Sequence, residues 1–124
     1  MTLLHEELTE RIIGAFYKVY NTLGYGFLEK VYENALVHAL RKAGLKVRQQ
    51  HGITVFYDEV AIGEYTADLL VEGVLLLELK AVKDLDDIRL AQCLNYLKAT
   101  SLRLCLLMNF AKPKVEIRRI VNNY

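Results

Sequence analysis

Three features of the sequence predict an α/β fold in which helices flank a mixed β-sheet. Two amphipathic helical patterns open the chain, an alternating apolar pattern with a central turn follows, and a further helical pattern precedes a continuous apolar run. With 124 residues, of which 53% are hydrophobic and 25% charged, the chain can bury a sizeable core. We therefore expect a single domain over residues 1–124, with elements in the order α-α-β-β-β-α-β-β.

The first two elements are predicted to be helices. Apolar residues recur at helical spacing over about residues 4–22, and Gly24 follows as a residue that suits a helix end. The second helix is expected over about residues 27–43, with basic residues in its last turn and a glycine after it. Its acids Glu29 and Glu33 lie one turn apart on one side, and acids are favoured near a helix N-terminus.

A first strand is expected over about residues 46–57, and Asp58 and Glu59 form the turn that ends it. The alternation of apolar and polar residues breaks close to Gly52. We expect a bulge or a bend of the strand at that glycine.

A central β-hairpin organises the rest of the prediction. Odd positions over residues 67–81 are apolar apart from the turn, whereas Asp68, Glu78 and Lys80 occupy even positions and therefore share one face. Pairing centred on Gly73 keeps apolar residues opposite apolar ones and sets Asp68 opposite Glu78. Two facing carboxylates repel each other and are costly to desolvate, so we expect Lys80 or a divalent metal ion to compensate them.

A third helix is expected to begin at Asp84 or Asp86, with acids in its first turn, and to continue through Ala99. Gln92 and Tyr96 stand one turn apart on it. The structural interpretation of this pair is hydrogen bonding to the sheet, and the functional one is support of a site.

Two further strands complete the predicted sheet. Residues 102–110 are almost continuously apolar, which favours a buried strand. Because a helix leads into it, this strand is expected to run parallel to the Glu78 strand through a right-handed crossover. Residues 115–121 alternate and are expected to form an edge strand.

Several of these segments together resemble one protein family. Asp68 followed by Glu78-Leu79-Lys80 is similar to the active-site pattern of the PD-(D/E)xK nuclease superfamily. The segment from Gly26 to Tyr32 resembles the motif of the GxxExxY family within that superfamily. Further similar segments are residues 32–36, 65–71 and 94–100. The resemblance covers nearly the whole chain and implies a restriction-endonuclease-like core.

The resemblance also implies a metal-dependent nuclease that hydrolyses phosphodiester bonds. Asp68, Glu78 and the backbone carbonyl of Leu79 would hold Mg²⁺ or Mn²⁺, because hard divalent cations prefer oxygen ligands. Lys80, on the same face as Glu78, would position the attacking water and counter the developing charge.

Residues on the helices are assigned supporting roles by the same resemblance. Glu29 would add an acid to the site from the second helix. Gln92 and Tyr96 resemble a Gln-x-x-x-Tyr motif of the superfamily, and Arg89 precedes them. These three residues are expected to contact the substrate or to support the groups that do.

Charge and cysteine content bear on partners and location. The net charge is +1. Two basic clusters suit either solvated faces or a surface that binds a phosphate backbone. The first comprises Arg41, Lys42, Lys46 and Arg48, and the second Arg103, Lys112, Lys114, Arg118 and Arg119. Cys93 and Cys105 are isolated and are expected to be buried thiols in a reducing cytoplasm. No apolar run can cross a membrane and no signal peptide is apparent, so we expect a cytoplasmic protein without a membrane partner.

Two other interpretations of the site remain open at this point. In the first, Asp68, Glu78 and Lys80 form a structural ion-pair cluster of a non-catalytic module that binds nucleic acid or protein. In the second, the protein is a metal-dependent hydrolase of another substrate. For the nuclease we expect nucleic acid as partner, DNA rather than RNA, and a homodimer is a reasonable expectation because so small a domain contacts little nucleic acid alone.

Overall fold

The structure is a computed structural model that describes residues 5–83, 85–110 and 115–122. Leu4, Asp84, Lys112 and Lys114, on which some predictions fall, lie outside these residues. The elements follow the predicted order: α1 (Glu6–Leu23), α2 (Glu29–Lys42), β1 (Val47–Tyr57), β2 (Val60–Val71), β3 (Leu75–Lys80), α3 (Asp87–Thr100), β4 (Leu104–Asn109) and β5 (Glu116–Val121).

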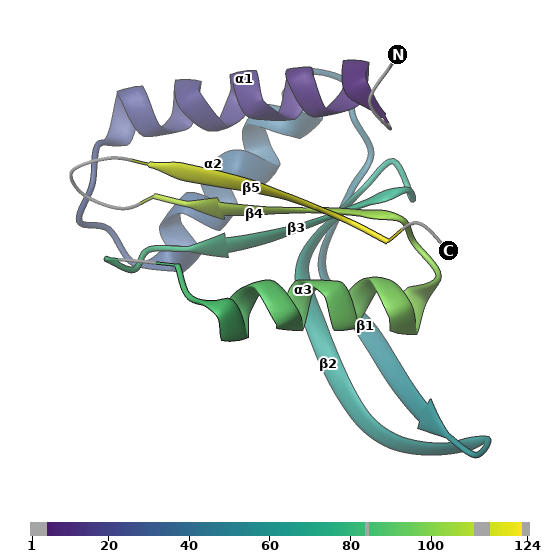
Figure 1. The fold of residues 1–124 in the computed structure, drawn as a ribbon. Coiled ribbons are helices and arrows are strands. Elements are labelled where there is room, and N and C mark those ends of the chain that lie inside the picture. Colours follow the sequence, from purple (N-terminus) through teal and green to yellow (C-terminus); the bar gives the residue numbers. More distant parts are fainter. Residues whose placement is uncertain (1–4, 84, 111–114, 123–124) are drawn as a thin grey trace.

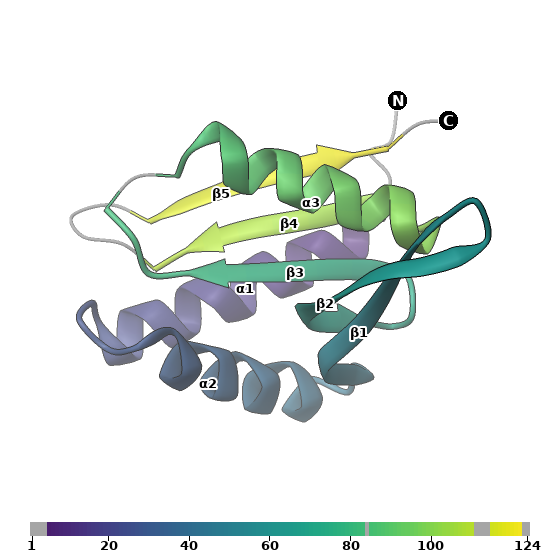
Figure 2. The same cartoon turned by 90° about the horizontal axis from the view of Figure 1, so that it is seen from below.

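The strands form one five-stranded mixed sheet in the order β1-β2-β3-β4-β5 (Figure 2). Neighbouring strands are antiparallel except β3 and β4, which are parallel. Helix α3 makes the crossover between these two strands, as predicted. All six residues of β4 are buried, which the continuous apolar run indicated.

Helices cover both faces of the sheet (Figure 1). The larger apolar cluster lies between the sheet and helices α1 and α2, and includes Phe16, Tyr32 and Leu77. A smaller cluster lies under α3 and includes Leu76 and Leu97. Leu76 and Leu77 belong to different clusters because successive side chains of a strand point to opposite faces.

Helix ends are set by local backbone chemistry. Gly24 follows α1 with φ of +74°, a conformation that glycine adopts without strain. Asp86 precedes α3, and its side chain accepts a hydrogen bond of 2.9 Å from the backbone N–H of Arg89. Of the two predicted starts, Asp84 and Asp86, the structure thus has the helix begin after Asp86.

The predicted hairpin register is confirmed where β2 and β3 pair. Leu69 lies opposite Leu77 and Val71 opposite Leu75, so the pairing is centred on Gly73. Glu72 and Gly73 both have positive φ, and the N–H of Val74 donates to the carbonyl of Val71 at 3.1 Å. These two residues therefore make the tight turn.

The predicted irregularity at Gly52 is wrong in position. Gly52 pairs with Thr66 in an undisturbed register, and the register shifts only between Val55 and Phe56. A second irregularity lies at Gln50, whose φ is +55°. A left-handed glutamine cannot be recognised from composition, whereas glycine attracts the prediction because it tolerates such backbones.

The outer parts of β1 and β2 leave the body of the sheet and project alongside α3 (Figures 1 and 2). We call the paired segments 53–57 and 60–65 the arm. Apart from the buried Ile53, the arm carries several exposed large side chains, and Tyr57, Val60 and Ile62 show 73%, 60% and 62% of their surface. Within the described ranges, no helix has the length and apolarity needed to span a membrane.

Candidate active site

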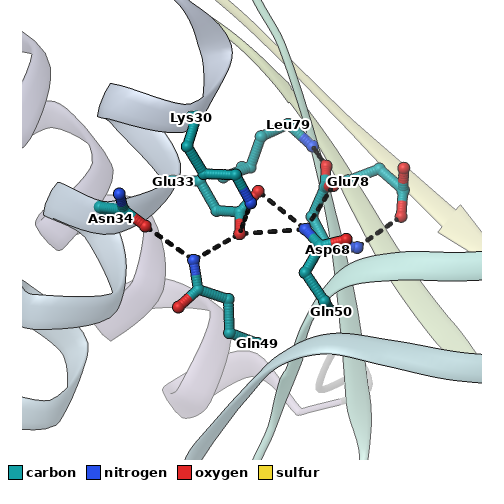
Figure 3. A network of polar contacts seen from close by, with 8 residues as sticks. All are labelled: Lys30, Glu33, Asn34, Gln49, Gln50, Asp68, Glu78 and Leu79. Carbon is teal, nitrogen blue, oxygen red and sulfur yellow. Dashed lines mark hydrogen bonds and ion pairs between the residues drawn. The ribbon is translucent and has the colours of Figure 1, made fainter.

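The two predicted carboxylates meet where β2 and β3 separate. Counted from the turn at Gly73, the pairing of these strands ends at Leu69 and Leu77. Asp68 and Glu78 are the next residues outward on the two strands. Beyond that point the N–H of Asp68 donates to Glu78 Oε1 at 2.9 Å, and the N–H of Leu79 donates to Asp68 Oδ2 at 2.7 Å (Figure 3). Two reciprocal hydrogen bonds to side chains thus replace the next ladder pair.

The conformation of Gln50 explains why the backbone N–H of Asp68 has no partner on β1. The β1–β2 register places Gln50 opposite Asp68, but this pair is missing between the pairs Gln49–Leu69 and His51–Ala67. The left-handed backbone of Gln50 interrupts the ladder at that point. The N–H of Asp68 is therefore available to the carboxylate of Glu78 on the other neighbouring strand.

Burial and mutual repulsion disfavour the ionised forms of both acids. Glu78 shows only 5% of its surface, and burial, followed by the charge of Asp68, raises the pKa of its carboxyl to about 8. Burial also raises the pKa of Asp68, against the hydrogen bond from the backbone of Leu79, which lowers it. In the absence of a compensating cation, the pair resists carrying two negative charges at neutral pH.

The donor set of this pair suits a hard divalent cation. Each carboxylate has one oxygen bound to a backbone N–H, and the second oxygen of Glu78 has no hydrogen-bond partner in the described part of the chain (Figure 3). The N–H and C=O of a strand residue project to the same edge, so the carbonyl of Leu79 faces Asp68. No group of three or more His, Cys, Asp or Glu side chains suited to a metal occurs among residues 5–83, 85–110 and 115–122.

Lys80 lies at an even position of β3, as Glu78 does, so both side chains leave the same face. Its positive charge lowers the pKa of Asp68 and of Glu78. The ion pairs found among the described residues join Lys30 to Glu33, Arg89 to Asp86 and Arg118 to Glu116, and none includes Lys80. Among the described residues, Lys80 thus acts on both acids through its charge without a direct ion pair to either.

Glu33 on α2 joins this site, which the sequence analysis did not predict. It shows 4% of its surface and accepts hydrogen bonds from the amides of Gln49 and Gln50, with Lys30 Nζ at 3.0 Å (Figure 3). The Gln50 amide also lies 3.5 Å from Asp68 Oδ1. A polar network thus connects the helix acid to the carboxylate pair.

A signal for Glu33 was present in the helix pattern. The buried positions of α2 are Tyr32, Glu33, Leu36, Val37 and Leu40, which form one stripe at helical spacing. An acid within an apolar stripe requires partners, and the adjacent glutamines of β1 supply them.

Glu29 does not take the position expected for it. Its side chain is exposed in the first turn of α2, and it has no part in the network that the described residues form. Glu29 lies one turn before Glu33 on the same side of the helix, at the first residue of α2. The buried stripe begins only at Tyr32 and therefore includes Glu33 but not Glu29. The expectation that Glu29 approaches the carboxylates is therefore corrected to Glu33.

The residues expected on α3 fall into two groups. Tyr96 is buried beneath the site, and its pKa is raised to about 12 by burial and then by the charge of Glu78, so its hydroxyl stays protonated. Gln92 is exposed and lines a cleft together with Tyr96. Arg89 forms an ion pair of 2.8 Å with Asp86 at the start of the helix, which indicates a structural role at the helix terminus.

Three other residues on this side are structural. Asn109, fully buried at the end of β4, holds the chain that leaves β3. Its Oδ1 accepts from the N–H of Val82 at 3.0 Å, and its Nδ2 donates to the carbonyl of Val82 at 2.8 Å. Cys93 and Cys105 are buried free thiols, as predicted, and a hydrogen bond with Cys93, followed by burial, raises the pKa of Cys105.

This combination of a mixed sheet flanked by helices with an Asp, Glu and Lys at the separation of two central strands is that of a restriction-endonuclease-like α/β core. A model of the PD-(D/E)XK nuclease superfamily matches residues 6–120. The chain therefore belongs to the PD-(D/E)XK nuclease superfamily. Its assignment to the GxxExxY family within it stays a prediction.

Solved structures with the same fold include two proteins of low sequence identity. One is SSO0001, with a TM-score of 0.59 and 14% identity over 77% of this chain and 50% of that one, so this chain spans half of its length. The other is an alkaline exonuclease, LHK-Exo, from Laribacter hongkongensis, with a TM-score of 0.58 and 13% identity over 99% of this chain and 73% of that one. A comparison with curated protein sequences found no significant match.

Proposed function

We propose that the protein is a metal-dependent nuclease that hydrolyses phosphodiester bonds of nucleic acid. The observation that carries this proposal is the reciprocal pairing of Asp68 and Glu78, which leaves carboxylate oxygen available in a desolvated position. Membership of the superfamily supports it, because PD-(D/E)XK nucleases generally use divalent metal ions.

In this proposal Asp68, Glu78 and the carbonyl of Leu79 hold Mg²⁺ or Mn²⁺. The ion, when bound, supplies charge neutralisation at the phosphoryl oxygens and lowers the pKa of bound water. The protein itself holds the carboxylates that would bind the metal in place. The N–H groups of Asp68 and Leu79 hold one oxygen of each carboxylate, which keeps both side chains in place without the ion.

Lys80 positions the attacking water and offsets negative charge that develops on the phosphate. Its place beside Glu78 and its effect on the pKa of both acids support this role. Glu33, in place of Glu29, supplies the acid from the helix, and acts through Gln50 on Asp68. Tyr96 and Gln92 contact the substrate on the α3 side. DNA is the favoured substrate. The cytoplasm is the favoured location.

A cleavage assay tests this proposal. Single-stranded DNA, duplex DNA and RNA are incubated with the protein in Mg²⁺ or Mn²⁺, and in chelator. Cleavage should need the divalent ion and should fall to background in Asp68→Asn, Glu78→Gln and Lys80→Ala. Lys83→Ala, which changes an exposed lysine after β3, is the matched control and should cleave like the wild type.

The pattern of results separates the alternatives. Cleavage that survives Glu78→Gln would assign the activity to another group or to a contaminant. Binding of nucleic acid without cleavage of any of the three substrates would favour a binding module, and loss of cleavage in Lys83→Ala would point to a general effect of surface charge.

A further inference from the structure

A cleft of about 540 Å³ lies between the arm and helix α3. Phe56 and Tyr65 line it from the arm, and Gln92, Asn95 and Tyr96 line it from the helix. Tyr96 connects the cleft with the site, because it packs in one cluster with Leu76, whose strand face Glu78 shares, and the charge of Glu78 acts on its hydroxyl. A ligand in this cleft would therefore lie beside the proposed reaction centre.

The arm supplies flat aromatic surface to the cleft. Phe56 shows 64% of its surface and Tyr65 shows 49%, although burying large aromatic side chains away from water is favourable. The ring centroids of Tyr65 and Tyr96 lie 5.9 Å apart, with the rings tilted by 46°. Exposed rings in such a position suit a planar group that stacks against them.

The helix supplies polar groups and one charge. Gln92 and Asn95 are exposed and three residues apart, so their amides project from the same side of α3. Each amide can donate and accept, which matches the mixed edges of nucleic-acid bases. Lys98 is the charged side chain among the described residues that line the cleft, and no acid accompanies it there.

We propose that this cleft is a subsite for unpaired bases of a nucleic-acid strand whose backbone passes Asp68 and Glu78. The inference rests on the proposed nuclease function and names its substrate class, which is single-stranded or locally opened nucleic acid. The faces of bases are hidden in a duplex, and they reach aromatic side chains only when the bases are unstacked. Lys98 offers a contact for a phosphate of the same strand.

Binding is measured by fluorescence anisotropy without divalent ions, with Glu78→Gln as parent so that no cleavage occurs. The probe is a fluorescein-labelled single-stranded oligothymidylate, compared with the same strand annealed to oligodeoxyadenylate. Adding Phe56→Ala or Asn95→Ala to the parent should weaken single-strand binding by about 5- to 100-fold, the range for loss of one stacking or edge contact. Tyr57→Ala removes a neighbouring aromatic side chain that is also exposed but does not line the cleft, and should leave binding unchanged.

The proposal is overturned if the cleft variants bind like the parent, if the duplex binds as tightly as the single strand, if the parent binds neither, or if Tyr57→Ala weakens binding as much as Phe56→Ala. Asn95 is an exposed helix position where alanine favours helix formation, so that variant separates contact from folding. Cleavage by the otherwise wild-type protein distinguishes the two proposals. Unaltered cleavage and binding in Phe56→Ala overturn the subsite alone, whereas cleft-dependent binding without any cleavage overturns the nuclease alone.

Discussion

Glu33 shows how much a single buried acid depends on its partners. Its carboxylate accepts from the amides of two consecutive residues of β1, Gln49 and Gln50, and pairs with Lys30. Consecutive strand residues normally point to opposite faces, so one acid reaches both glutamines only because Gln50 is left-handed. The position of this acid and the conformation of that strand residue are therefore coupled.

The two acids of α2 make a matched pair of variants. Glu33→Gln should lower the cleavage rate by about 10- to 100-fold, the usual effect of removing a group that orients metal ligands. Glu29→Gln should cleave at the wild-type rate, because that side chain is exposed and outside the network. Initial rates under single-turnover conditions measure both, and equal losses in the two variants would contradict the assignment of Glu33.

The pKa of Glu78 predicts how stability without metal varies with pH. The folded protein holds a proton on Glu78 up to a pKa of about 8, whereas the unfolded chain releases it near 4.5. Between these values the folded state binds more protons, so the free energy of unfolding should fall as pH rises from about 5 to 8. Asp68, whose pKa is also raised, adds a change of the same sign.

Glu78→Gln removes the larger part of this dependence. Compared with the wild type in chelator, the variant should gain stability at pH 8 and little at pH 5, because the glutamine carries no charge to desolvate. Urea denaturation at several pH values measures the difference. Parallel pH profiles for the two proteins would show that Glu78 is not the group that titrates.

At the scale of elements, one residue of β1 opens the sheet. Gln50 interrupts the β1–β2 ladder opposite Asp68. Strand β2 pairs with β3 only from Leu69 to Val71, so Asp68 is also unpaired on that side. The site therefore lies where both ladders of β2 lose a pair. A non-glycine residue with positive φ stores strain that the surrounding hydrogen bonds must offset.

Substitution of Gln50 separates its backbone from its amide. Gln50→Gly and Gln50→Ala both remove the contacts with Glu33, but only glycine fits φ of +55° without strain. The alanine variant should be less stable than the glycine variant by about 1 kcal/mol. Denaturant unfolding measures the difference, and equal stability would mean that Gln50 is not left-handed in solution.

The sequence predicted the carboxylate pair because alternation over residues 67–81 permits one register, and a slip by one would bury the charges. The parallel strand β4 was predictable for a similar reason, since its continuous apolar run suits burial on both faces. Glu33 and Gln50 could not be placed in this way. Their conformations depend on contacts between α2 and β1, which neither local pattern contains.

At the scale of the whole molecule, the proposed metal site predicts that divalent ions change the stability of the fold. An ion bound only by the folded protein should stabilise it by about 2.7 kcal/mol at a hundredfold excess over the dissociation constant. The melting temperature of the wild type should therefore rise with Mg²⁺ or Mn²⁺. Glu78→Gln should lose this rise and Lys80→Ala should keep it, and an unchanged wild-type melting temperature in both ions would count against the metal site.

The arm ends in a turn of two residues, Asp58 and Glu59, and its tip projects away from the body of the sheet (Figure 1). Insertions at such an exposed turn are tolerated, since each doubling of loop length adds only about 0.6 kcal/mol of closure entropy. Related proteins can thus lengthen or replace the arm while the strands that carry Asp68 and Glu78 stay unchanged. A foreign loop grafted there would change the proposed substrate contacts and leave the proposed metal ligands as they are.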